Sequence, residues 1–249
     1  MITIKSEREI ELMRHAGMLV SKMHQFIKPY IKEGITTKEL DKLCEDFIRS
    51  NDGIPTEKGY EGFPASICAS VNDEVVHGIP GSRKLKNGDI ITIDTVISYK
   101  GYQGDAARTY IVWKPNSVED QKLVEVTKQS FFEALKYAKK GYRVGDISNA
   151  VYEYVTQNGF SILREFQGHG IGREMHEDPG IPNYGKPGRG MRLEPGMTIC
   201  IEPMVIAGNR EILELDDGWT IVSRDGSNGA HYENTILITE NEPEILTKP

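Results

Sequence analysis

The stretch Leu85–Asp94, which reads LKNGDIITID, decides the fold of this 249-residue chain. Its apolar run closed by an acid is typical of a strand that enters a core. The stretch Leu193–Glu202 reads LEPGMTICIE and repeats the Leu, the Gly, two Ile and the terminal acid at the same places, 108 residues later. Because only two copies are present, the similarity indicates two related halves and not a solenoid.

A second pair of segments fits nearly the same offset. Gly34 leads into a helical pattern that ends near Gly53, and Gly141 leads into one that ends at Gly159, with the two starts 107 residues apart. Chance is the alternative, since a Gly-x-x-Ile-x-Ile pattern is common in strand-rich proteins. We expect an α+β fold in a single catalytic domain, 1–249, with αβ halves of about 1–113 and 114–249 around a mainly antiparallel sheet.

Four carboxylates and one imidazole lie at or near the ends of short β-type runs, at Asp94, Asp105, His169, Glu202 and Glu233. A carboxylate at a buried strand end is costly unless it is paired or bound to a metal. Four converging carboxylates would repel one another and take up protons, and two divalent cations would cancel that charge. The sequence therefore predicts a dinuclear metal site if the five residues meet. The alternative is a set of strand-end acids and a surface histidine with no common site.

The spacing of these residues suits hydrolysis. Asp94 and Asp105 fall on adjacent antiparallel strands, about 4.8 Å apart, if the turn lies at Tyr99–Gly101. Gly168 and Gly170 flank His169 and would let the backbone come close to a metal. Oxygen-rich ligation with one imidazole suits Mn, Fe(II) or Co, and Zn also fits. Such a pair of metals activates water and polarises a carbonyl, and a nearby carboxylate can pass a proton to a leaving amine.

Composition excludes several classes of protein. The chain is 38% hydrophobic and 27% charged, and its net charge of −7 without a Lys/Arg run argues against a nucleic-acid partner. The three cysteines, Cys44, Cys68 and Cys200, form no CxxC, so no zinc ribbon or disulfide framework is indicated. No apolar stretch is long enough for a membrane span, and Met1–Glu7 lacks an apolar signal core. We expect a reduced, cytoplasmic compartment and no membrane partner.

The motifs closely resemble those of type I methionine aminopeptidases, the bacterial-type enzymes with the pita-bread fold, over nearly the whole chain. The stretches that carry the resemblance are Ser70–Pro80 (SVNDEVVHGIP), Asp94 with Gly104-Asp105, Gly168–Gly172 (GHGIG) with His176-Glu177, Ile201–Met204 (IEPM) and Tyr232-Glu233. The resemblance implies removal of the initiator methionine from nascent proteins and peptides when the second residue is small. It implies nascent N-termini as partners and leaves contact with the ribosome open. We expect a monomer, because nothing in the sequence demands a larger assembly.

The resemblance also assigns roles to residues. It implies that Asp94, Asp105, His169, Glu202 and Glu233 hold two divalent ions, with Co, Mn, Fe(II) and Zn as candidates. A metal-bound hydroxide would attack the scissile carbonyl, with Glu202 as the proton shuttle. His77 would contact the scissile amide or the P1′ side, and His176 would stabilise the oxyanion. The methionine pocket would be formed, together with these two histidines, by Tyr60, Phe63, Cys68, Met175 and Trp219.

The chain departs from the family pattern at three positions and leaves two other functions open. Asn234 replaces a common histidine, Met175 a common phenylalanine and His231 a glutamine found in some relatives. A prolidase or X-Pro aminopeptidase would share the fold and ligands but usually carries a further N-terminal domain. A non-catalytic binding protein would have lost ligands. The pocket aromatics Tyr60, Phe63 and Trp219 could also be plain core residues.

Overall fold

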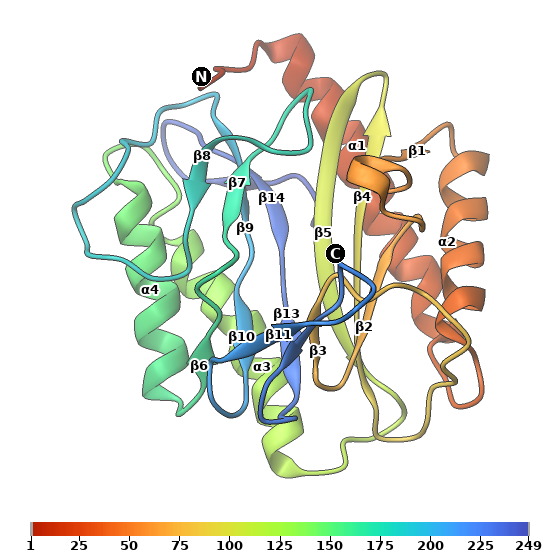
Figure 1. Ribbon diagram of the computed structural model, residues 1–249. Coiled ribbons are helices and arrows are strands. Elements are labelled where there is room, and N and C mark those ends of the chain that lie inside the picture. The colour runs from red at the N-terminus through yellow and green to blue at the C-terminus, as the bar shows by residue number, and fades with distance from the viewer. Residues whose placement is uncertain (1, 249) are drawn as a thin grey trace.

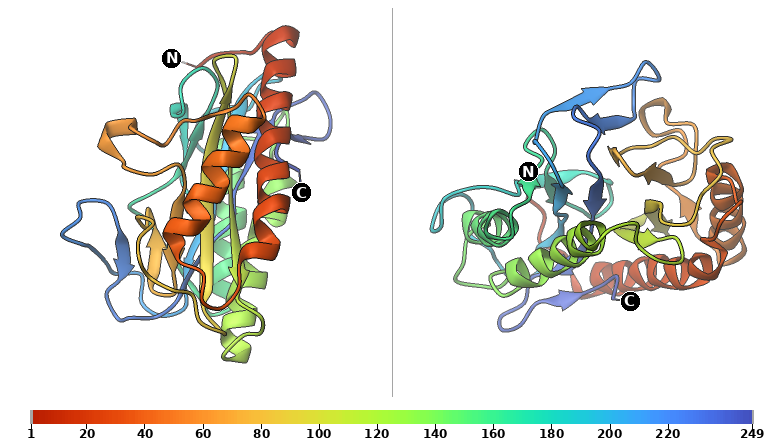
Figure 2. Two further views of the ribbon diagram at one scale, coloured as in Figure 1. Left: turned by 90° about the vertical axis from the view of Figure 1, so that its right-hand side faces the viewer. Right: turned by 90° about the horizontal axis from the view of Figure 1, so that it is seen from below.

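Each half of the chain contributes two helices that pack against its strands. The structure, a computed structural model, describes residues 2–248. Its helices are α1 (Glu7–Ile27), α2 (Thr37–Ser50), α3 (Val118–Leu135) and α4 (Val144–Gln157), with short 3-10 turns η1 (Lys28–Tyr30) and η2 (Tyr60–Gly62). Figure 2 shows all four α-helices along one side of the strands, which leaves the other side to strands and loops.

The strands are short apart from one central hairpin (Figure 1). Their bounds are β1 (Ile54–Pro55), β2 (Cys68–Val71), β3 (Glu74–Val76), β4 (Ile90–Tyr99), β5 (Tyr102–Ile111), β6 (Ser161–Ile162), β7 (Gly168–Gly170), β8 (Glu177–Ile181), β9 (Thr198–Ile201), β10 (Met204–Ile206), β11 (Ile212–Glu214), β12 (Ile221–Ser223), β13 (Gly229–His231), β14 (Asn234–Leu237) and β15 (Glu244–Ile245).

The strands pair in an antiparallel manner, which confirms the predicted α+β class. In the first half β4 pairs with β1, β2 and β5, and in the second half the order is β15-β14-β9-β7-β8. Two small sheets, β13-β10-β6 and β11-β12-β3, complete the strand side. The two similar segments of the sequence thus end in β4 and β9, one in each main sheet. Whether they arose by duplication stays a prediction.

Local signals set most element ends. At α1 the Glu9 N–H donates to the Ser6 hydroxyl (3.5 Å) and the Ser6 N–H donates to the Glu9 carboxylate (2.8 Å), which is the capping box that a Ser followed by a Glu three residues later predicts. The sequence also predicts a helix at about 118–139 and a loop over 178–192, and both bounds are wrong in detail. Helix α3 ends at Leu135, where the backbone passes into turns such as the bond from the Tyr137 N–H to the Ala134 carbonyl oxygen. Residues 178–181 belong to β8, which pairs with β7, so the loop starts after this strand.

Each half of the chain has its own main apolar core. One lies between α1, α2 and the β2–β4–β5 sheet, and the other between α3, α4 and the β9–β14 sheet. A fully buried side chain such as Ile93 or Phe131 contributes about 1.5–3 kcal/mol to folding. The two sheets meet where the Asp105 N–H donates to the Thr235 hydroxyl (2.9 Å), which in turn donates to the Asp105 carbonyl oxygen (2.9 Å). Within residues 2–248, no helix has the length and apolar character that a membrane crossing requires.

Candidate active site

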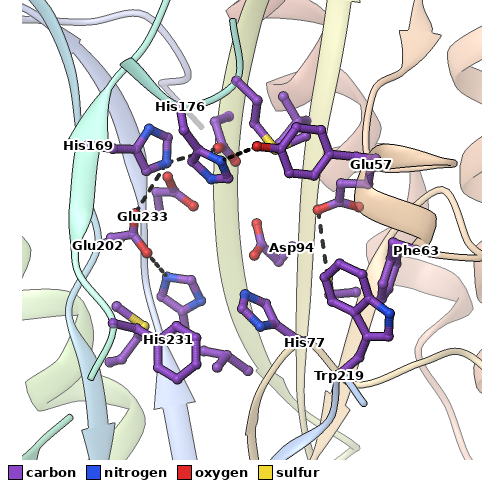
Figure 3. A pocket seen from close by; sticks show the side chains of 18 of the residues that line it. Glu57, Phe63, His77, Asp94, His169, His176, Glu202, Trp219, His231 and Glu233 are labelled. Atoms are coloured by element: carbon purple, nitrogen blue, oxygen red, sulfur yellow. Dashed lines mark hydrogen bonds and ion pairs between the residues drawn. The ribbon is translucent and has the colours of Figure 1, made fainter. Parts of the chain in front are cut away.

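One cavity of about 290 Å³ is lined by every residue that the sequence predicted for the site. These residues are Tyr60, Phe63, Cys68, His77, Asp94, Asp105, His169, Met175, His176, Glu202, Trp219 and Glu233. They come from both halves of the chain, and Figure 3 shows Asp94, Glu202 and Glu233 turned toward one another across the cavity. The condition set by the sequence, that these segments meet in space, is fulfilled.

The β4–β5 hairpin brings the two aspartates to one face of the first sheet. Tyr99 pairs with Tyr102, so the turn lies at Lys100–Gly101, inside the predicted span. Asp105 lies opposite Val96, two positions along β4 from Asp94. Because side chains of residues two apart share a face of a strand, both carboxylates point into the cavity.

The second sheet supplies the other three predicted ligands. Glu202 directly follows β9 and Glu233 directly precedes β14, where Asn234 pairs with Ile201. His169 sits on β7 between two glycines, as the sequence suggested. A Cβ on Gly168 would lie 2.3 Å from the Cys200 carbonyl oxygen, so this close approach of two backbones admits only glycine there.

Several buried carboxyl groups of the cavity have oxygens without hydrogen-bond partners that would stabilise a negative charge. Oδ1 of Asp94, Oδ1 of Asp105 and Oε1 of Glu233 are buried without a hydrogen-bond partner among residues 2–248. Burial raises the pKa of Asp94 to about 6, and it raises the pKa of Asp105 well above its ordinary value, with further contributions from Glu233 and Asp94. Burial also raises the pKa values of Glu202 and Glu233 well above the ordinary range.

The donor set fits divalent cations. One oxygen each of Asp105 and Glu233 and one nitrogen of His169 lie within 4.8 Å of one another, near the separation of about 3–4 Å between ligands of one cation. His169 Nε2 lies 3.4 Å from Glu202 Oε1 and 3.7 Å from Asp105 Oδ2. Cations at these atoms would satisfy the unpartnered oxygens and cancel the repulsion.

His169 is held in the form that binds metals. Its Nδ1 is 2.9 Å from the Gly170 carbonyl oxygen, which can only accept, so the ring proton lies on Nδ1. Nε2 is then free to face the acids. Burial lowers the pKa of His169 to about 4, so the ring is neutral at neutral pH.

Two further histidines, His77 and His176, line the cavity beside the acids and are not among the predicted metal ligands. His176 Nδ1 is 2.9 Å from the Tyr60 hydroxyl, and its ring stands edge-on to that of His169 at 4.4 Å between centroids. His77 has a positive φ of 59°, a conformation that non-glycine residues rarely adopt and that is enriched at functional sites. Burial lowers the pKa of His77 to about 4, and it also lowers the pKa of His176.

Aromatic side chains form the end of the cavity beside His77. The Phe63 and Trp219 rings meet edge-to-face at 5.1 Å, and the His77 and Phe166 rings do so at the same distance. Phe63 and Cys68 belong to a small apolar cluster against which Trp219 packs. This end of the cavity is an apolar, aromatic slot beside the acids, suited to a thioether side chain.

The sequence profile of metallopeptidase family M24 matches residues 11–240. This chain is a member of that family. It is 52% identical to methionine aminopeptidase 1 of Bacillus subtilis over 248 residues, covering 100% of both chains. The crystal structure of methionine aminopeptidase from Thermotoga maritima superposes with a TM-score of 0.98 at 46% identity and 100% coverage of both chains. The prolidase of Pyrococcus furiosus, at 24% identity, shares the fold with a TM-score of 0.79; the match covers 99% of this chain and 65% of the prolidase.

These comparisons confirm the resemblance that the motifs indicated. Members of this family are metallopeptidases, so the protein is a hydrolase that uses divalent metal ions. The buried carboxylate oxygens of Asp94, Asp105 and Glu233 that lack hydrogen-bond partners agree with this chemistry. The protein has the pita-bread fold of its structural neighbours.

Sequence reasoning missed several residues that line the cavity of the M24 chain. They include Glu57, Glu61, Phe166, Gln167 and Met204. Glu57 is 7% exposed, its Oε2 has no hydrogen-bond partner among the described residues, and Oε1 accepts only a 3.8 Å bond from the Cys68 thiol. Its position three residues before Tyr60 in a Gly- and Pro-rich loop was the available signal. His231, which the sequence analysis named only as a departure from the family pattern, lies in the wall with Nε2 3.7 Å from Glu202 Oε2.

The three departures from the family pattern lie at different distances from the cavity. Met175 lines the cavity, so it shapes the pocket directly. His231 is 2% exposed and faces Glu202. Asn234 is fully buried and lies behind Glu233, where its side-chain oxygen accepts hydrogen bonds from Arg108 (2.6 Å) and the Thr247 hydroxyl (3.0 Å).

Proposed function

We propose that this chain is a methionine aminopeptidase that hydrolyses the peptide bond after an N-terminal methionine. One observation carries the proposal. The five ligand-type side chains from both sheets and the apolar slot formed by Phe63 and Trp219 line the same cavity. An exopeptidase for methionine needs this juxtaposition, because the side chain must sit in the slot while its own carbonyl carbon faces the acids. Full-length similarity to methionine aminopeptidases supports the assignment.

The metal ligands in this proposal are Asp94, Asp105, His169, Glu202 and Glu233. Two divalent cations would supply polarisation of the scissile carbonyl and a lowered pKa for water. The ligand types agree with Mn, Fe(II), Co or Zn and do not choose among them. The protein contributes the His169 tautomer and the acids that lack other partners.

Glu202 is the proposed proton carrier between the attacking water and the leaving amine. Its two oxygens face different imidazoles, with Oε1 3.4 Å from His169 and Oε2 3.7 Å from His231. Burial raises the pKa of Glu202 well above its ordinary value. A carboxyl group with a raised pKa is suited to accept and release a proton near neutral pH.

His176 is the proposed donor to the developing oxyanion. If the Tyr60 hydroxyl donates to Nδ1, the His176 proton sits on Nε2 and is available to a substrate oxygen. His77 would contact the scissile amide or the P1′ side, and Tyr60, Cys68 and Met175 would complete the methionine pocket. The preference for a small second residue rests on the family resemblance.

The substrates in this proposal are the N-termini of nascent polypeptides in the cytoplasm, and the active form is a monomer. Contact with the ribosome is left as an open part of the proposal. These inferences rest on the family resemblance.

The proposal is tested by hydrolysis of Met-Ala-Ser, Ala-Ala-Ser and Ala-Pro after the protein is stripped of metal and reloaded with Mn, Co, Fe(II) or Zn. We expect metal-dependent release of methionine alone, which would also rank the metals. Release from the proline dipeptide would assign the chain to the prolidases. No release with any metal, together with no binding of two cations in a titration, would favour a non-catalytic binding protein.

A further inference from the structure

A second cavity of about 280 Å³ lies behind the candidate active site, on the side of the strands that the helices cover. Its walls come from α1, β5 and α3, which lie side by side in Figures 1 and 2, and from the segment His231–Tyr232. Among the described residues that line it, three are cationic, Lys28, Arg108 and Lys128, and none is acidic. This concentration of positive charge stands out in a chain with a net charge of −7.

Arg108 forms part of the wall and is only 7% exposed. Its guanidinium donates to neutral acceptors, namely the carbonyl oxygens of Ala107 (2.8 Å), Glu233 and Thr247 (3.0 Å) and the side-chain oxygen of Asn234 (2.6 Å). It forms no ion pair with any carboxylate in residues 2–248. A buried cation without a counter-ion costs several kcal/mol, so an anion beside it would be stabilising.

The two lysines stand exposed around the cavity and are not engaged elsewhere. Neither the Lys28 nor the Lys128 ammonium has a hydrogen bond or an ion pair with a residue that the structure describes. The Tyr232 ring lies 4.5 Å from Cζ of Arg108 and 5.9 Å from Nζ of Lys128, and its buried hydroxyl has no partner in the described chain. The cavity thus offers two ammonium groups without a hydrogen bond or ion pair among the described residues.

We propose that this second cavity binds a small tetrahedral oxyanion, inorganic phosphate or a phosphomonoester, held by the Lys28 and Lys128 ammonium groups and attracted by the charge of Arg108 in the wall. Its volume lies near the lower end of the range of about 300–1,000 Å³ for small-molecule sites, which suits a small anion. Arginine and lysine together are the usual recognition groups for phosphate.

The position of the cavity links anion binding to the candidate metal centre. His231 lines both cavities, and Arg108 donates to the backbone carbonyl of the ligand Glu233. An anion that repositions Arg108 would alter the support of Glu233, and the effect must be reciprocal. We therefore expect phosphate to change the affinity of the protein for metal, and metal loading to change the affinity for phosphate.

The test is titration calorimetry of the full-length, metal-loaded protein with inorganic phosphate and, separately, phenyl phosphate, at constant ionic strength. We expect one saturable site in the wild type. The double variant Lys28→Ala/Lys128→Ala should weaken phosphate binding by about tenfold or more. The control Lys22→Ala/Lys122→Ala removes the same charge from α1 and α3 outside the cavity and should leave the affinity within about twofold.

Tighter binding of phenyl phosphate than of phosphate would identify a phosphomonoester as the fitting ligand, and the reverse would identify free phosphate. Equal binding by wild type and the Lys28→Ala/Lys128→Ala variant would place the phosphate at the metals and overturn the proposal. The absence of saturable binding at millimolar phosphate would overturn it as well. Because binding is measured without turnover, either result is independent of the proposed peptidase activity.

Discussion

The Arg108 guanidinium donates a 2.6 Å hydrogen bond to the Asn234 side-chain oxygen, immediately behind Glu233. The same guanidinium donates to the Glu233 carbonyl oxygen, so Arg108 holds both the backbone of Glu233 and the side chain of Asn234. The replacement of a common family histidine by Asn234 is thus accommodated locally, because the amide oxygen supplies an acceptor that a buried arginine requires. The hydrogen bond between Arg108 of the first half and Asn234 of the second half therefore supports the proposed ligand Glu233.

Removal of this acceptor should damage both stability and metal binding. We expect Asn234→Ala to lower the free energy of unfolding by about 1–3 kcal/mol, because an Arg108 donor loses a buried partner. Metal affinity should fall by about 10–100-fold, the usual effect of removing support from a ligand. Urea unfolding of the metal-free protein and a metal titration measure the two effects. Unchanged metal affinity would show that Glu233 is positioned without this pair.

Loss of Glu202 should abolish most of the activity. We expect Glu202→Ala to lower kcat for Met-Ala-Ser by at least about 10²–10⁴-fold, since the proton carrier is removed together with a ligand. Metal content should be measured in parallel. If the variant still binds two cations, the loss reports proton transfer. Turnover close to that of the wild type would refute the assigned role.

His176 should act on the chemical step more than on affinity. We expect His176→Ala to lower kcat by about 10²–10³-fold with a much smaller change in KM, since an oxyanion donor acts mainly in the transition state. Tyr60→Phe, which removes only the hydroxyl 2.9 Å from Nδ1, should give a smaller loss of kcat. Steady-state kinetics on Met-Ala-Ser separates the two parameters. A pure rise in KM for His176→Ala would contradict the oxyanion role.

Metal removal should make stability depend on pH above neutrality. The buried acids Asp105, Glu202 and Glu233 have raised pKa values, so each contributes stability at low pH that is lost as pH rises through its folded pKa. Buried histidines such as His169, with a pKa lowered to about 4, add no slope above pH 6.5 because they are neutral in both states. The metal-free protein should therefore lose stability from about pH 6.5 upward.

In the metal-loaded protein the cations satisfy these carboxylates. We therefore expect the difference in Tm between loaded and stripped protein to widen from pH 6.5 to pH 8.5. Thermal unfolding of both forms across this range provides the measurement. A constant difference would mean that these acids are not the groups that the metal relieves.

Ionisation of the buried Glu57 carboxyl should lower the free energy of unfolding at high pH. Burial, followed by Asp94 and Asp105, raises the pKa of this carboxyl well above its ordinary value, so its stabilising protonated form is lost as pH rises. We expect Glu57→Gln to be more stable than the wild type at pH 8 and nearly equal to it at pH 4.5. The exposed Glu61 of the same loop offers a matched control, Glu61→Gln, with little effect at either pH. A pH-independent difference for Glu57→Gln would indicate altered packing.

The strands that carry the acids could be predicted because their signals are local. An apolar run such as Ile90–Ile93 closed by an acid indicates a buried strand end whatever its neighbours are. The α1 capping box is read from two residues three apart. The end of α3 and the start of β8 could not be predicted, because a helix end without a strong breaker and a strand with weak local preference depend on hydrogen-bond partners elsewhere.

The family, the main strands and the proposed metal ligands could be predicted from the sequence, because short local motifs encode them, and the family resemblance supplied the pocket residues. What fills the space between those motifs depends on the tertiary fold. Glu57 became part of the cavity wall because a Gly- and Pro-rich loop folds over the β4–β5 hairpin. Arg108 became a buried cation without a counter-ion because α1, α3 and β14 close around β5. Such burial and charge balance arise from contacts between segments far apart in the chain, which no local pattern specifies.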